Sequence, residues 1–292
     1  MAFSGELVHG AWMRWLRDAA PDVATWLHDG NKRRLFTCSS LQFPLSPQRM
    51  LEAERENIHL PVSPEKTYIV RITLLLGELF PLFYNALMRF NQGEKGAGSL
   101  PFMQIGKQLF LLEEVIVEND GPSGWSGFTT LTTMVEQVRM LRLGQTETLK
   151  LEFASLTTFN RSNSKERGGY GVHYARLPLP QYIFPGLAKR WEDVAPPELL
   201  DLVQKERIEH YIQEDGVIIV DYDLKPHSVR FTTHPQQGFI GMCKYHVRAS
   251  QEAATPESPF TMQQQLLLLA RLAFYCGVGY KTSMGMGRVR LL

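Results

Sequence analysis

The chain has 292 residues, of which 44% are hydrophobic and 21% are charged, a composition typical of a globular protein rather than a disordered one. The 31 Lys and Arg residues nearly balance the 30 Asp and Glu residues, which excludes a polyanion-binding tail but allows a local basic face. Three widely spaced cysteines, Cys38, Cys243 and Cys276, indicate neither a zinc site nor a disulfide framework. No apolar run reaches the roughly 20 residues of a membrane span, and no secretory signal is visible. We therefore expect a cytoplasmic protein without membrane contact.

The first half of the chain predicts the element order α-β-β-α-β. Apolar residues at helical spacing extend over 7–29, and Pro21 marks a break that divides this segment into two helices. A basic cluster follows at residues 32–34. Further along we expect strands over 35–43, 67–75 and 109–117 and a helix over 78–90. We also expect Trp12, Trp15 and Trp26 to fill core positions.

The second half predicts the order β-α-β-β-α-β, which is the split βαβ or ferredoxin-like unit. We expect strands over 148–159, 217–232, 238–248 and 288–292, and helices over 178–191, 197–214 and 261–276. The first half has the same order with its first strand missing. The sequence therefore predicts an α+β fold of two tandem ferredoxin-like domains, over residues 1–143 and 144–292, of which the first lacks its first strand.

A glycine-rich loop follows the last predicted helix, with Gly277, Gly279, Gly285 and Gly287 around Lys281. A dinucleotide-binding motif needs the order strand, loop, helix, whereas this loop follows a helix and precedes a strand. Its backbone can approach a phosphate chain closely, with a lysine beside it. A helix cap followed by a tight turn explains the same glycines equally well.

His28 ends a predicted short helix just before the basic cluster. A histidine can move a proton near neutral pH, and neighbouring cations can stabilise negative charge that develops at phosphorus. These groups are the minimum needed to cleave RNA without a metal, by attack of the 2′-hydroxyl on the adjacent phosphate. A helix-capping histidine beside a solvated charge run is the alternative. We expect no metal and no cofactor, and we assign His227 and His234 to surface or turn positions.

Four stretches resemble the CRISPR repeat-processing endoribonucleases of the RAMP superfamily. They are residues 7–41, LEFASLTTFNR at 151–161, LPLPQYIFPGLAKRW at 177–191, and GFIGMCKYHV with FYCGVGYKTSMGMGRVRL at 238–247 and 274–291. The resemblance implies two ferredoxin-like domains and binding of CRISPR repeat RNA in the precursor transcript. It also implies metal-independent cleavage that leaves a 5′-hydroxyl and a 2′,3′-cyclic phosphate. The guide RNA would then pass to a CRISPR interference complex.

The resemblance also implies a set of site residues. In family members with a Tyr/His/Lys site, the histidine position is His28, the lysine position is Arg34, and the tyrosine position is Met13 here. Arg34 keeps the charge but does not readily donate a proton, so Lys32 and Tyr280 are alternative contributors. We take His28, Arg34 and Lys32 as the catalytic candidates. The RNA-binding candidates are Gly277, Gly279, Lys281, Gly285, Gly287, Arg288, Arg161, Lys165 and Arg167.

Two departures from the family keep a second function open. Family members begin with a strand that this chain lacks room for, so we expect the reading frame to continue upstream with a β-rich segment. The substitutions at Met13 and Arg34 favour a RAMP subunit that holds guide RNA in an interference complex without cutting it.

Overall fold

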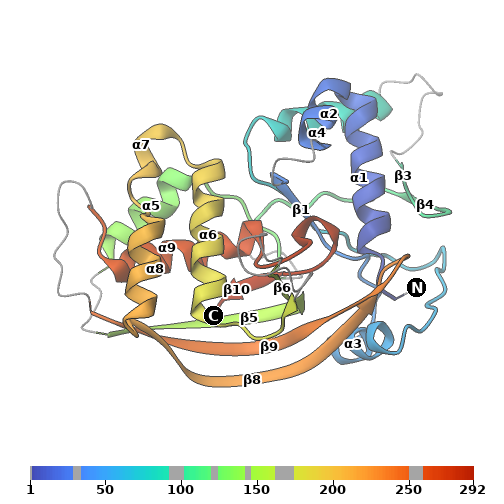
Figure 1. Ribbon diagram of the computed structural model, residues 1–292. Coiled ribbons are helices and arrows are strands. Elements are labelled where there is room, and N and C mark those ends of the chain that lie inside the picture. Colours follow the sequence, from blue (N-terminus) through green and yellow to red (C-terminus); the bar gives the residue numbers. More distant parts are fainter. Residues whose placement is uncertain are drawn as a thin grey trace. The chain divides into compact units, whose positions relative to one another are not determined.

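The computed structural model describes residues 2–28, 34–91, 102–119, 124–141, 146–161, 174–249 and 259–292. The chain divides into two compact units (Figure 1). The first unit comprises Met1–Ala53, Ile58–Phe128 and Ser283–Gly285, and the second comprises Glu54–Asn57, Thr129–Thr282 and Met286–Leu292. The predicted boundary after residue 143 lies within 142–145, outside the described residues.

The second unit is built on a four-stranded antiparallel sheet with the strand order β10-β5-β9-β8. The strands are β5 (Thr146–Thr157), β8 (Val217–Arg230), β9 (Pro235–Arg248) and β10 (Val289–Leu291). The helices are α5 (Leu131–Met140), α6 (Pro180–Val194), α7 (Pro197–Leu200), α8 (Lys205–Gln213) and α9 (Met262–Cys276). The short strands β6 (Phe159–Asn160) and β7 (Tyr174–Ala175) form a separate pair. The chain order β5-α6-β8-β9-α9-β10 in this sheet is the ferredoxin-like unit that the sequence predicts.

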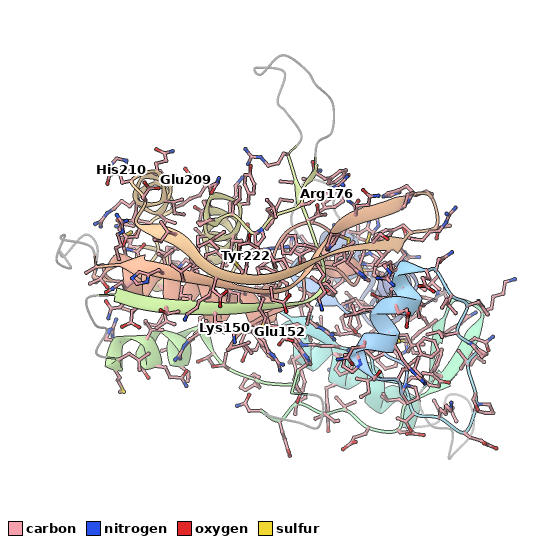
Figure 2. All side chains as sticks on the ribbon, turned by 90° about the horizontal axis from the view of Figure 1, so that it is seen from below. Lys150, Glu152, Arg176, Glu209, His210 and Tyr222 are labelled. Atoms are coloured by element: carbon pink, nitrogen blue, oxygen red, sulfur yellow. The ribbon has the colours of Figure 1, made fainter. Side chains whose placement is uncertain are left out.

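The alternation of side chains along β5 shows why the helices cover one face of this sheet. Leu149, Leu151 and Phe153 are buried, whereas Lys150 is exposed and Glu152 is partly exposed (Figure 2). Successive residues of a strand point to opposite faces, so the apolar set lies under the helices seen above the sheet in Figure 1. The helix α9 starts with a capping box made by Thr261 and Gln264, which satisfies amides that the helix itself leaves without partners.

The first unit contains the elements α1 (Gly5–Ala19), α2 (Pro21–His28), β1 (Phe36–Cys38), β2 (Ile72–Leu74), α4 (Leu79–Asn91), β3 (Phe102–Ile105) and β4 (Gln108–Leu111). It also contains most of α3 (Pro47–Arg55), whose residues from Glu54 on belong to the second unit. The strands form two antiparallel pairs, β1 with β2 and β3 with β4. Among the described residues no strand precedes α1. The elements α3 and β3 are not predicted from the sequence.

Two of the three tryptophans expected in the core lie there. Trp12 and Trp15 are buried, and each packs against the ring of Phe83, at centroid distances of 5.8 and 5.7 Å. The prediction for Trp26 is wrong, because its side chain is 42% exposed while Ala24 on the same helix is buried. A helix of eight residues buries one face, and Trp26 lies on the other. None of the described helices is long and apolar enough to cross a membrane.

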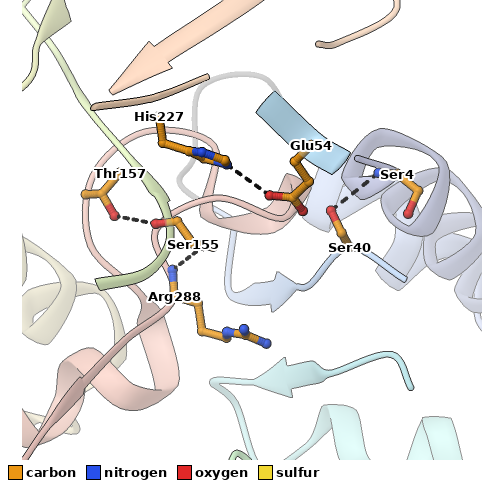
Figure 3. Close-up of polar contacts among 7 residues, drawn as sticks. All are labelled: Ser4, Ser40, Glu54, Ser155, Thr157, His227 and Arg288. Carbon is orange, nitrogen blue, oxygen red and sulfur yellow. Dashed lines mark hydrogen bonds and ion pairs between the residues drawn. The ribbon is translucent and has the colours of Figure 1, made fainter. Parts of the chain in front are cut away.

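The surface assignment of His227 is also wrong. Its side chain is 3% exposed, and its Nε2 lies 3.1 Å from the Glu54 carboxylate, which is 12% exposed (Figure 3). Glu54 lies near the end of α3 but belongs to the second unit with His227. The pair therefore links the end of α3 to strand β8.

We predict that Glu54→Ala lowers the free energy of unfolding by about 1–3 kcal/mol, because it leaves the buried imidazole of His227 without its acceptor. Glu52→Ala is the matched control, since Glu52 is an exposed carboxylate on the same helix. Urea unfolding followed by circular dichroism measures both variants. Equal stabilities of the two variants would contradict a structural role for the pair.

Candidate functional site

His9, His28 and Arg34 are brought together in the first unit. His28 is the last residue of α2 and is exposed. The Arg34 guanidinium donates a hydrogen bond to the carbonyl of Leu27, so it caps the C-terminus of α2, where a cation is favoured. Burial lowers the pKa of His9 below its ordinary value of 6.5 and outweighs the hydrogen bond to Ser283, which raises that pKa. Electrostatic interactions with Arg34 and His28 lower it further. His9 is therefore held mainly neutral at pH 7, close to His28 and to the guanidinium of Arg34.

The hydrogen bond of His9 determines which of its nitrogens can accept a proton. Its Nδ1 lies 2.9 Å from the backbone carbonyl of Ser283, and its ring stacks on the buried ring of Phe36 with centroids 5.5 Å apart. A carbonyl oxygen only accepts hydrogen bonds, so Nδ1 must carry the proton. Neutral His9 then has its lone pair on Nε2, which makes that atom a base.

The segment Ser283–Gly285 that holds His9 belongs to the first unit. The Gly285 amide donates to the Cys38 carbonyl at 2.9 Å. Gly5, the first residue of α1, packs so closely here that a Cβ on it would lie 1.9 Å from the Met284 carbonyl oxygen. His9 follows Gly5 by four residues and so lies above it on the same helix face. The close contact at Gly5 therefore positions His9 over Ser283.

The sequence predicted His28 and Arg34 as site candidates and missed His9. The signal for His9 was its spacing, because it lies four residues before Met13, where the resemblance implies a tyrosine, and thus on the same face of α1. Met13 itself is 5% exposed and lies in the core. Lys32 lies outside the described residues.

Close packing within the second unit explains two glycines of the loop, Gly279 and Gly287. A Cβ on Gly279 would lie 2.5 Å from the Thr158 carbonyl oxygen, and one on Gly287 would lie 2.1 Å from that of Val278. Both residues also have positive φ angles, of 89° and 70°, which favour glycine. The Gly287 amide donates to the Leu156 carbonyl. The amides of Gly285 and Gly287 therefore already donate hydrogen bonds to carbonyls of the protein. A role of these two glycines in RNA binding would come from the shape that they give the loop.

The basic RNA-binding candidates have different surroundings. The Lys281 ammonium lies 3.8 Å from the centroid of the Phe231 ring, and the Arg161 guanidinium lies 4.9 Å from that of Tyr182. Burial lowers the pKa of Arg288, while the carboxylates of Glu54 and Glu152 act in the opposite direction. The Arg288 side chain is thus partly buried in the second unit, and its backbone amide donates to the Ser155 hydroxyl (Figure 3).

The remaining RNA-binding candidates are Gly277, Lys165 and Arg167. Gly277 ends α9 with a φ angle of 67°, whereas Lys165 and Arg167 lie outside the described residues. Within the described ranges, no three His, Cys, Asp or Glu side chains are grouped as metal ligands.

Comparison with known proteins gives one family and a set of similar structures. The family of the CRISPR-associated endoribonuclease Cas6 matches residues 151–289, just under half of the chain. A product complex of Cas6 (TTHB231) aligns with a TM-score of 0.72 and 23% identity, over 99% of this chain and 94% of that chain. A product complex of Cas6 (TTHA0078) aligns with a TM-score of 0.66 and 23% identity, over 99% and 93%.

A further structure, Thermus thermophilus Cas6 (TTHB231), aligns with a TM-score of 0.59 and 22% identity, over 98% of this chain and 90% of that chain. No curated protein matches the sequence. The structural likenesses show a common fold along the whole chain. The family match and these structures confirm the resemblance to CRISPR repeat-processing endoribonucleases that we infer from the sequence.

Two glycines of α1 provide a test of the packing that positions His9. We predict that Gly5→Ala destabilises the protein by about 1–3 kcal/mol, because the new Cβ collides with a backbone carbonyl. Gly10 is exposed, and a Cβ there would meet no atom within 4 Å. Gly10→Ala should therefore stabilise the protein by about 0.5–1 kcal/mol through the better helix propensity of alanine. Urea unfolding measures both, and a change of the same sign in the two variants would contradict the close contact.

Proposed function

We propose that this chain is a metal-independent endoribonuclease that binds CRISPR repeat RNA and cleaves the precursor transcript into guide RNAs. The Cas6 match of residues 151–289 supports this function, as does the fold shared with Cas6 proteins whose complexes contain product or a substrate mimic. The observation that carries it is the neutral His9, with its basic Nε2, close to His28 and Arg34.

The proposed reaction is an internal transfer at phosphorus. His9 Nε2 removes the proton of the 2′-hydroxyl, and the 2′-oxygen attacks the adjacent phosphate. The bond from phosphorus to the 5′-oxygen breaks, and His28 gives that oxygen a proton. Arg34 stabilises the additional negative charge on the phosphate oxygens. The products are a 2′,3′-cyclic phosphate and a 5′-hydroxyl.

Accessible basic side chains supply the proposed RNA binding. Arg161 and Lys281 are exposed or half-buried, so they can reach the phosphate backbone and make affinity depend on salt. Lys165, Arg167, Arg288 and the loop glycines remain candidates for the same role, and Lys32 remains a catalytic candidate. After cleavage, the guide RNA would pass to a CRISPR interference complex.

We predict that a repeat RNA is cut at an unchanged rate in excess EDTA, because the proposed acid and base are side chains. The same RNA with a 2′-deoxy nucleotide at the scissile position should bind but stay uncut, since its nucleophile is missing. Denaturing gels measure both reactions. Loss of cleavage in EDTA that magnesium restores would reject metal independence, and cutting of the deoxy substrate would reject the 2′-hydroxyl as nucleophile.

We predict that His9→Ala and His28→Ala each lower the single-turnover cleavage rate by about 10²–10⁴, the usual contribution of an acid or base group. RNA affinity should change little. His9 acts when neutral and its pKa lies below 6.5, so on the acidic side the wild-type rate should fall as the pH drops through that lower value. This acidic limb should vanish in His9→Ala.

The matched control is His210→Ala, because His210 is an exposed histidine on α8 (Figure 2). It should cut at the wild-type rate. A wild-type protein that binds the repeat but never cuts it would instead support the non-catalytic guide-RNA subunit. The burial of Met13 and the bond from Arg34 to the Leu27 carbonyl are the observations that favour this second function.

A further inference from the structure

A strip of the second unit carries aromatic rings together with basic side chains, and it is separate in sequence from His9 and His28. The strip consists of His234, Lys281, Tyr280, Tyr174, Tyr182 and Arg161. Its residues come from the turn between β8 and β9, the glycine loop, β7, the position after β6, and α6. Contacts between rings, cations and strands connect each member to the next.

Lys281 forms the first part of the strip. Its backbone has a φ of 55°, an uncommon conformation for a residue with a side chain. Its ammonium lies 3.8 Å from the centroid of the buried Phe231 ring and 3.5 Å from His234 Nε2. The His234 ring lies parallel to Phe231, with centroids 5.5 Å apart. The cation is therefore held in one place by two aromatic rings.

Tyr280 and Tyr174 form the middle of the strip. Their rings lie 5.6 Å apart, and both side chains are partly exposed. The Tyr280 amide donates to the Thr158 carbonyl at 2.8 Å, and Tyr174 pairs with Asn160 in the β6–β7 ladder. These contacts fix the backbone at both residues, and the two rings pack against each other, which lowers the entropy cost of stacking a ligand on them.

Arg161 and Tyr182 complete the strip. Arg161 directly follows the β6–β7 ladder, and its guanidinium lies 4.9 Å from the Tyr182 ring centroid. Tyr182 in turn packs on Phe159 of β6 at 5.6 Å. Arg161 is exposed and Tyr182 is partly exposed. The strip therefore presents a cation at each end with tyrosine rings between them.

We propose that this strip binds unpaired nucleotides of the RNA, with bases stacked on Tyr280 and Tyr174 and phosphates beside Lys281 and Arg161. Stacked bases in a duplex hide their faces, whereas unpaired bases can lie on protein rings, and every base has such a face. A surface that carries both rings and cations fits unpaired RNA better than it fits a duplex stem, because a stem offers chiefly its phosphates. The proposal rests on the RNA-binding function proposed above and assigns the form of RNA that this surface takes.

The test measures the affinity of an unstructured RNA and of a blunt RNA stem by fluorescence anisotropy. Tyr280→Ala and Tyr174→Ala should each weaken binding of the unstructured RNA by about 5- to 150-fold, the usual effect of losing one stacked base. Tyr280→Phe and Tyr174→Phe keep the ring and should bind as the wild type does. Affinity for the stem should stay the same in all four variants.

The matched control is Tyr222→Ala, since Tyr222 is a tyrosine on β8 with 68% of its surface exposed (Figure 2). It should leave both affinities unchanged. Equal losses for the unstructured RNA and the stem, or no loss in the alanine variants, would overturn the proposal. Single-turnover cleavage at saturating protein separates it from the cleavage function. Selective loss of single-strand affinity in a protein that cannot cut would keep the strip and reject the endoribonuclease.

Discussion

The close contact between the first turn of α1 and Ser283–Gly285 is the constraint on which the candidate site depends. Gly5 has no room for a side chain there, so α1 and this segment approach at backbone distance. The approach brings the Ser283 carbonyl within 2.9 Å of His9 Nδ1. One packing contact therefore determines both where the imidazole lies and which of its nitrogens can take a proton. The same short segment is part of a glycine loop whose other residues pack within the second unit.

Much of the fold can be predicted from sequence patterns. The elements of the ferredoxin-like order in the second unit have strong signals, such as the alternation along β5 and the long apolar helix α9, so this order was predictable. Helix α5 and the short pair of β6 and β7 were not predicted. The first unit has strands of only three or four residues, too short for a clear alternation. Helix α3 has a single buried residue, Ala53, so its periodicity was weak. The prediction that Trp26 is buried was wrong because residue type alone does not tell which face of a short helix is buried.

The candidate site was only partly predictable for a different reason. His28 stood out because it precedes a run of basic residues, and the family resemblance pointed to the same position. His9 and Ser283 meet across 274 residues, and no local pattern reports such a contact. The same holds for Glu54 and His227, which are 173 residues apart. Sequence patterns report periodicity and local caps, whereas these two pairs arise from tertiary packing.

The separation of His9 and Ser283 in the sequence also determines when the site can form during synthesis of the chain. Synthesis produces position 9 early and position 283 late, so a growing chain carries both histidines long before it contains the carbonyl that orients the first one. During that interval the imidazole of His9 is free to carry its proton on either nitrogen and to rotate. If the proposed chemistry holds, a ribosome-bound chain cannot yet act as a nuclease on the transcripts around it. The activity would begin only when the segment Ser283–Gly285 packs against α1. Completion of the fold would therefore be required before the protein can cleave RNA.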